Sequence, residues 1–320
     1  MKLVVTGSIA FDYLMQFPGK FTEHILPEHL QRVSLSFLVE SMDKRRGGCA
    51  PNIAYTLALL GERPYLMATA GQDFREYDDW LQAAGVDTSH VHHVRDKFTA
   101  SFFCSTDTEH NQIASFYIGA MANASELSLR TIPKPGLVII SPNDPGAMIQ
   151  YAEECRALGV PFIFDPGQQC ARLSGDDLRD GIRGARVVIC NDYEFELIRQ
   201  KTGLGEDGIL AMADSLIVTR GEDGCSVYES GQGGRGNGQP ARQDVKALTP
   251  HRIVDPTGVG DAFRGGLMKG IATDKSLREC AQLGVVAATY ALEHLGGQSH
   301  AYTVAEFTER YGRHFGSLSL

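Results

Sequence analysis

Short apolar runs alternate with segments of helical periodicity along most of the chain. The runs predicted to be buried strands are 3–6, 65–70, 137–141, 162–164, 187–190 and 215–219. Helices are predicted at 50–60 and 74–84, each followed by a glycine, and another begins at Asp144, a typical N-cap residue followed by Pro145. Strand–helix alternation of this kind predicts a doubly wound, mostly parallel α/β sheet flanked by helices on both faces.

Two regions interrupt this alternation. They hold four strand-like segments without clear crossover helices, at 13–17, 32–39, 99–105 and 112–118. We expect these segments to form a small β-sheet lid that is inserted into the body at two points. The predicted division is a body of 1–12, 40–96 and 119–320, and a lid of 13–39 and 97–118. After Asp255 the pattern is mostly helical, and Thr303 and Glu306 have the spacing of a capping box for the last helix.

The charge balance and the cysteines indicate which partners and which cellular compartment to expect. The chain carries 30 Lys and Arg against 39 Asp and Glu, a formal net charge of −9. A net negative body does not attract nucleic acids or anionic membranes, so neither is an expected partner. No apolar stretch approaches the roughly 20 residues that span a bilayer, and the N-terminus lacks a signal-peptide pattern. Seven scattered cysteines without a C-x-x-C motif predict free thiols and a cytoplasmic protein.

One glycine-rich segment has the spacing of a nucleotide-binding motif, but the residues around it do not fit that motif. Within 231–240, Gly231, Gly233 and Gly236 have the spacing of a dinucleotide-binding motif. That motif requires a preceding strand and a following helix N-terminus, whereas here a proline and a polar run follow. We expect a flexible hairpin loop instead.

The strongest chemical signal is the run Asp255-Pro-Thr257-Gly258-Val259-Gly260-Asp261 followed by Ala-Phe-Arg-Gly-Gly. The small residues permit a tight turn that aims several N–H groups at one point, and the helix that follows directs its positive end there. Asp261 lies in the first turn of that helix. An anion hole beside a base is what phosphoryl transfer to a hydroxyl requires. An ordinary loop followed by a favourable first-turn acid is the plain alternative.

The chain resembles the ribokinase-like (PfkB) family of sugar and nucleoside kinases. The run at 255–266 is similar to that family's C-terminal signature, and Gly47-Gly-Cys-Ala-Pro-Asn-Ile-Ala54 is similar to its N-terminal one. The two stand about 200 residues apart in family order, which makes chance coincidence improbable. The resemblance runs from Gly7 to Gly296 and implies an α/β body with a small β-sheet lid, ATP as donor and Mg²⁺ as cofactor.

By this resemblance, Asp261 deprotonates the acceptor hydroxyl, and the amides of 258–261 hold the transferring phosphoryl group. Asp12, Gly48 and Asn52 match positions that bind sugar hydroxyls, for which carboxylate, N–H and carboxamide groups are suitable partners. The plain alternatives are a turn acid for Asp12 and a helix-start residue for Asn52. Cys49 is expected to be a small neighbour of the sugar and not a nucleophile, because nothing nearby lowers its pKa.

Two further segments resemble nucleotide-binding elements of the family. Asn191 and Glu194 match its Asn-x-x-Glu motif, which implies that Glu194 contacts the water shell of Mg²⁺. The same spacing is also a capping pattern in any protein. The turn that contains Thr219, Gly221 and Gly224 is similar to one that contacts ATP, although a plain hairpin turn has the same composition.

The resemblance also raises a monovalent cation, because many members of the family use one near the anion hole. Asp255 and Thr257 fall where such a K⁺ site would draw oxygen ligands, together with carbonyls near Gly296. Arg264 is unusual, since a cation in the first turn opposes the helix dipole. Its partner, a phosphate or a carboxylate, is left open by the sequence.

The lid favours a nucleoside acceptor of the adenosine-kinase type, with the base left open. A purine needs flat apolar surfaces, and the lid segments are rich in aromatic residues. Phe116 is one candidate for stacking and Gln112 for a base edge, although most of these aromatic residues are expected to form the lid's own core. The alternatives are a sugar kinase (ribose, fructose or a keto-deoxy sugar acid) and a non-catalytic nucleotide-binding relative. Monomer and homodimer both stay open.

Overall fold

The computed structural model describes residues 1–25, 35–230 and 241–317. Within them, the larger sheet has nine strands in the spatial order β13-β12-β11-β10-β9-β8-β1-β4-β5. Neighbouring strands from β11 to β5 run parallel, whereas β12 and β13 are antiparallel. The bounds are β1 Leu3–Thr6, β4 Tyr65–Ala70, β5 Val91–His93, β8 Leu137–Ile140, β9 Phe162–Phe164, β10 Val187–Asn191, β11 Ser215–Thr219, β12 Cys225–Glu229 and β13 Ala241–Val245. The predicted mostly parallel α/β sheet is confirmed.

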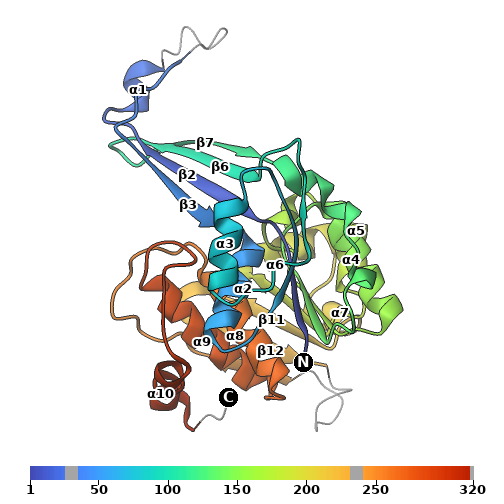
Figure 1. The fold of residues 1–320 in the computed structure, drawn as a ribbon. Coiled ribbons are helices and arrows are strands. Elements are labelled where there is room, and N and C mark those ends of the chain that lie inside the picture. The colour runs from blue at the N-terminus through green and yellow to red at the C-terminus, as the bar shows by residue number, and fades with distance from the viewer. Residues whose placement is uncertain (26–34, 231–240, 318–320) are drawn as a thin grey trace.

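Helices cover both faces of this sheet (Figure 1). One face packs against α2 Cys49–Leu59, α3 Arg75–Ala83, α8 Val259–Ala272, α9 Leu277–Leu292 and α10 Val304–Phe315. The other packs against α4 Pro145–Leu158, α5 Gly175–Ile182, α6 Asp192–Thr202 and α7 Glu206–Leu210. Alternation along β1 shows the division, because Leu3 and Val5 belong to the first core and Val4 to the second.

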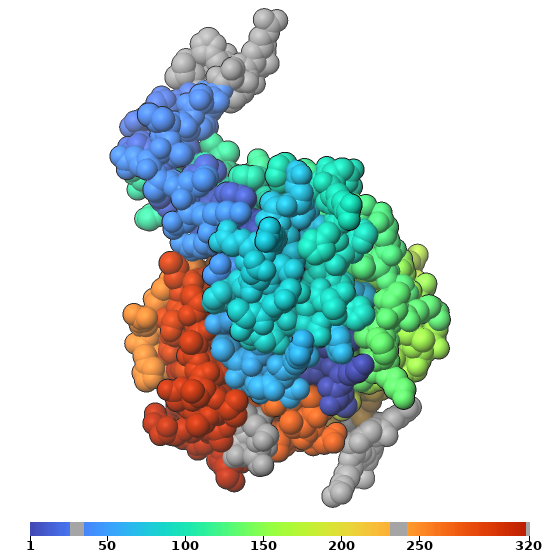
Figure 2. All heavy atoms as spheres, viewed as in Figure 1, coloured from blue at the N-terminus to red at the C-terminus, as the bar shows by residue number. Residues whose placement is uncertain are grey.

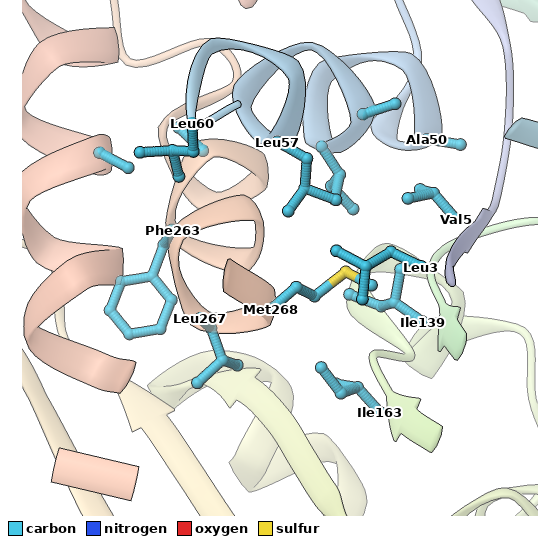
Figure 3. Packing of buried hydrophobic residues seen from close by; sticks show 14 of the residues in the cluster. Leu3, Val5, Ala50, Leu57, Leu60, Ile139, Ile163, Phe263, Leu267 and Met268 are labelled. Atoms are coloured by element: carbon cyan, nitrogen blue, oxygen red, sulfur yellow. The ribbon is translucent and has the colours of Figure 1, made fainter. Parts of the chain in front are cut away.

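Helix α8 lies at the centre of the first core. Leu267 points from it to the sheet and Met268 lies near Leu3 and Ile139, whereas Phe263 points towards α9 (Figure 3). On its opposite side α8 contacts α9 at very short range, since a Cβ added to Gly266 would lie 2.5 Å from the carbonyl oxygen of Leu283. A side chain at position 266 would therefore push the two helices apart, and the position of α8 depends on that glycine.

A second, four-stranded sheet forms the lid, in the order β3-β2-β6-β7 among the described residues. Its strands are β2 Ala10–Gln16, β3 Ser41–Gly47, β6 Ala100–Thr106 and β7 Gln112–Tyr117. The lid projects from the body, with the short helix α1 (Phe21–His24) at its far end (Figures 1 and 2). Among the described residues, short 3₁₀ helices lie at Gly119–Glu126, Leu129–Thr131, Gly167–Ala171 and Gly221–Asp223.

The predicted strand at 32–39 is wrong. Residues 32–34 lie outside the described part, 35–39 form no strand, and the lid strand is β3 at Ser41–Gly47. The apolar alternation near Phe37 has a different cause, because Phe37 packs edge-on against Phe17 and Phe21 at ring distances of 5.1 and 4.9 Å. β3 is an edge strand with mainly exposed, charged side chains, and such strands lack an apolar signature.

The lid sheet also draws on residues outside the expected ranges 13–39 and 97–118, since β3 and the first residues of β2 belong to it. Three of the smaller predictions are confirmed: the N-cap at Asp144, the capping box at Thr303, and seven free cysteines. The glycine-rich segment 231–240 lies outside the described residues. Among the residues that are described, no helix is both long and apolar enough to cross a membrane.

The α8–α9 contact generates a stability prediction. Gly266→Ala should lower the free energy of unfolding by about 1–3 kcal/mol, because the added methyl group meets backbone atoms that have no room to move. Denaturant titration followed by circular dichroism measures it. Gly312→Ala in α10 is the matched control, since nothing lies within 4 Å of its added Cβ, and it should leave stability unchanged or slightly higher. Equal behaviour of the two variants would contradict the packing argument.

Candidate active site

Several polar residues gather where parallel strands of the large sheet end. Asn191 closes β10, Thr219 closes β11, and the two are direct neighbours in the parallel register. Asp165 directly follows β9, and its side chain forms an ion pair with Arg264 in the first turns of α8. The carboxyl edge of the sheet and the N-terminus of α8 therefore meet, which is the usual place for a ligand in an open α/β sheet.

The start of α8 has the geometry of an anion hole. Gly258 is its N-cap residue and has φ 77°, in the left-handed region that favours glycine. A Cβ at this position would also lie 2.6 Å from the Cα atom of Gly297. Among the described residues, the N–H groups of Gly260 and Asp261 have no protein acceptor. Two unpaired N–H groups at the positive end of a helix provide a binding site for an anionic oxygen.

The carboxylate of Asp261 lies beside these N–H groups. Its Oδ2 accepts a hydrogen bond of 2.8 Å from Nδ2 of Asn52, in the first turn of α2. Burial raises the pKa of Asp261 to about 6, against the opposing effects of the Asn52 hydrogen bond and the Arg264 guanidinium. The group is thus ionised near neutral pH, yet basic enough to accept a proton.

Asn52 is held by a second set of hydrogen bonds that the sequence does not reveal. Its Oδ1 accepts a bond of 2.8 Å from Gln298, which also contacts the hydroxyl of Tyr77. That hydroxyl donates to the carbonyl oxygen of Gly47 at 2.9 Å. Both polar atoms of Asn52 are engaged within the protein, so in this structure the side chain orients Asp261. Tyr77 and Gln298 belong to no motif, and their 221-residue separation leaves no local signal.

Asp12 and Phe116 lie on the same face of the lid. In register, Asp12 pairs with Arg45 of β3 and Phe102 of β6, and Phe102 pairs with Phe116 of β7. Paired residues of neighbouring strands project from one face, so the four form a row across the sheet. Arg45 at one end lies 3.5 Å from Asp255, which shows that this face is turned towards the loop before α8.

Gln112 lies at the other end of β7 and is exposed. It pairs with Thr106, four residues beyond Phe102 along β6, which corresponds to about 13 Å along the strand. The structure thus places Phe116 in the row of Asp12 but leaves Gln112 apart from it. Gly48 is on the body side of the same region, as the N-cap residue of α2.

The predicted nucleotide-binding residues lie together, and their plain structural roles are also present. Asn191 and Glu194 form a complete capping box, with bonds of 2.7 and 2.8 Å. Burial raises the pKa of Glu194, and the neighbouring Asp165 adds to this effect. Gly221 and Gly224 belong to the turn between the antiparallel strands β11 and β12, which follows Thr219 directly. Among the described residues, no cluster of three or more His, Cys, Asp or Glu side chains provides a metal site.

Asp255 is held by groups of the protein itself. Its two oxygens accept bonds of 2.9 Å from the N–H groups of Thr257 and Gly296. Burial alone would raise the pKa of Asp255. The hydrogen bonds and the nearby Arg45 guanidinium outweigh this effect and hold the pKa below its usual range. The expected proximity of Asp255, Thr257 and Gly296 is therefore found. An ionised carboxylate beside an exposed loop is a suitable oxygen ligand for a cation, but Arg45 occupies part of its surroundings.

Arg264 has a carboxylate as its partner. Its Nε and Nη2 donate to the two oxygens of Asp165, each at 2.6 Å, and both side chains are buried. The sequence left the partner open, and Asp165 was not a candidate. The dipeptide Asp165-Pro166 after the strand is typical of an ordinary loop, so the sequence gives no sign of this pair. Only the three-dimensional contact identifies it.

Comparison with known proteins gives consistent results. A model of the pfkB family of carbohydrate kinases matches residues 3–303. A nucleoside kinase of Methanothermobacter thermautotrophicus is 27% identical, with 98% of this chain and 96% of its own length covered. The solved structure of the Burkholderia thailandensis nucleoside kinase in complex with inosine is 37% identical, covers 98% of both chains and has a TM-score of 0.85. The nucleoside kinase of Methanocaldococcus jannaschii, an archaeal member of the ribokinase family, is 26% identical, with 98% and 99% covered and a TM-score of 0.85.

The fold and the matched length lead to one assignment. The ribokinase-like body and its separate small sheet agree with those of the solved relatives, and the family model includes both signature segments. The chain belongs to the pfkB family of carbohydrate kinases and is a phosphotransferase that acts on a hydroxyl group.

Proposed function

We propose that this kinase transfers the terminal phosphoryl group of ATP to the 5′-hydroxyl of a nucleoside. The observation that carries the proposal is the Asp261 carboxylate beside the unpaired N–H groups at the start of α8. The nucleoside kinases among the similar proteins, one of them bound to inosine, support a nucleoside over a free sugar.

The reaction follows from this pairing of groups. The acceptor hydroxyl gives its proton to Asp261 while its oxygen forms a bond to the γ-phosphorus, and ADP leaves with the electrons of the broken P–O bond. The N–H groups of Gly258, Gly260 and Asp261 stabilise the charge on the transferring phosphoryl group, whereas that of Val259 donates to the carbonyl oxygen of Pro256 at 3.3 Å. Glu194 would hold the water shell of a Mg²⁺ ion, since this ion keeps most of its waters, and the bound ion would supply positive charge to the ATP phosphates. The adenine nucleotide lies along Asn191, Thr219 and the turn that follows.

The acceptor lies between the lid and the start of α2. Asp12 and Gly48 bind the ribose hydroxyls there, and Asn52, whose Nδ2 carries two N–H groups, donates one to Asp261 and the other to the sugar. The exposed ring of Phe116 and its neighbour Phe102 offer apolar surfaces to the base, in the same row as Asp12. Gln112 lies about 13 Å further along the same sheet, so its contact with a base edge stays a prediction.

Asp261→Asn tests the base. It should reduce kcat by about 10²–10⁴-fold while ATP binding is retained, because the amide keeps the shape but does not accept a proton. For the unchanged protein, kcat/KM should fall as the pH drops below about 6, since protonation of Asp261 removes the base. Steady-state ADP release with Mg-ATP and calorimetric ATP titration measure both effects.

A suitable control is Asp176→Asn, whose side chain is 95% exposed on the surface. It should behave like the unchanged protein in both assays. Normal turnover in Asp261→Asn would refute the assignment of the base, whatever the acceptor.

The acceptor is tested with a panel of nucleosides and free sugars: adenosine, inosine, guanosine, cytidine, ribose, fructose and 2-keto-3-deoxygluconate. Turnover should be confined to nucleosides. Phe116→Ala should raise KM for these nucleosides about tenfold, the loss expected for one aromatic stacking partner. Tyr193→Ala, which truncates an exposed aromatic residue on α6, should not change KM. Turnover of a free sugar alone would overturn the nucleoside assignment but keep the kinase.

The loop around Asp255 and Thr257 is the place for a monovalent cation. Replacing Na⁺ by K⁺ should raise kcat, and the increase should be larger in Arg45→Gln, because removal of the guanidinium exposes the Asp255 carboxylate. Arg63→Gln, at an arginine that is 78% exposed, is the control and should respond like the unchanged protein. Identical rates in Na⁺ and K⁺ for all three proteins would contradict this site.

A further inference from the structure

The pair of Asp165 and Arg264 needs a physical explanation. Burial of two charges is unfavourable unless their geometry is nearly ideal, and a cation in the first turns of a helix is opposed by the helix dipole. Both unfavourable effects apply here. The side chains of Asp165 and Arg264 are only 2% and 9% exposed, and Arg264 lies one turn after Gly260 in α8. An interaction that forms despite two unfavourable terms suggests a role beyond packing.

The contacts of the pair tie the start of α8 to the sheet. The guanidinium binds Asp165 with two parallel bonds of 2.6 Å, and its remaining nitrogen Nη1 donates to the carbonyl oxygen of Gly260 at 3.1 Å. Asp165 is itself fixed, because its N–H donates to Ile140 at the end of β8. A continuous set of hydrogen bonds thus leads from the sheet to the residue that precedes Asp261.

The pair also sets the charge around Asp261. The groups that face this carboxylate are Asn52 and Cys49 from α2, Arg264 from α8 and Asp165 beyond β9, while Tyr77 of α3 is near enough to be affected by it. Of these, only Arg264 carries a positive charge. It lowers the pKa of Asp261, whereas Asp165 raises it, so the two partners act on the carboxylate in opposite directions.

We propose that Asp165 and Arg264 are positioning residues for phosphoryl transfer, which hold the first turn of α8 so that its N–H groups and Asp261 stay directed at one point. This inference rests on the proposed role of Asp261. Neither side chain touches a reacting atom, and both act through α8. Their opposite charges provide a signature that a purely structural ion pair does not have.

The experiment compares the pH dependence of kcat/KM in single variants. Arg264→Met removes the positive charge beside Asp261, so the acid limb should move to higher pH by about 1 unit. Asp165→Asn leaves the guanidinium without its counter-charge, so the limb should move to lower pH by a similar amount. Arg264→Lys keeps the charge but not the two-pronged geometry, and should restore the position of the limb with kcat still reduced.

A second buried pair provides the matched control. Arg310 and Glu293 form two bonds of 2.7 and 2.8 Å and are 9% and 8% exposed, but neither is among the main groups that shift the pKa of Asp261. Arg310→Met and Glu293→Gln should lower the melting temperature and leave the acid limb in place.

The outcomes separate the two levels of inference. An active unchanged enzyme whose Asp165 and Arg264 variants keep the normal limb would overturn the positioning role and leave the kinase intact. An inactive unchanged enzyme would instead refute the proposed acceptor. If Arg264→Met does not fold, Asp165→Asn decides alone: a limb at lower pH supports the role, and an unmoved limb refutes it.

Discussion

One hydrogen bond joins residues 209 positions apart in the sequence, from Asn52 at the start of α2 to Asp261 at the start of α8. It can form only if both helices begin at the same point above the sheet. Two close packing contacts ensure this, since Gly266 lets α8 approach α9 and Gly265 lets it approach Thr56 of α2. The large apolar core around α8 is thus the support that positions a few polar atoms.

Much of the body was predictable because its signals are local. Buried strands such as Tyr65–Ala70 are mostly apolar runs. The helix that follows Asp144 is predicted by its N-cap residue and by Pro145 in the first turn. The resemblance of two motifs also placed Asn52 and Asp261 in one site, and the structure brings them together. Motifs of this kind are informative because their residues are adjacent in the chain and share one turn.

What escaped prediction depends on contacts between distant segments. The strand β3 is charged on both faces, so nothing in its sequence distinguishes it from a loop. The roles of Gln298 and Asp165 become visible only in the structure, where Gln298 donates to Asn52 and Asp165 accepts from Arg264. The case of Gln112 differs again, because its distance from the row of Asp12 is set by the register of the lid sheet, in which Gln112 pairs with Thr106 and not with Phe102.

The arrangement of charges explains why the site needs more than its motif. A base that is also to lie in an anion hole must stay ionised in a partly desolvated place, next to a phosphoryl group that is itself negative. Backbone N–H groups provide dipoles for the phosphoryl oxygens but no net charge. A buried arginine supplies that charge, and a second carboxylate moderates it, so that Asp261 is neither protonated at neutral pH nor too weak a base. In the proposed site, the buried ion pair of Asp165 and Arg264 meets both demands.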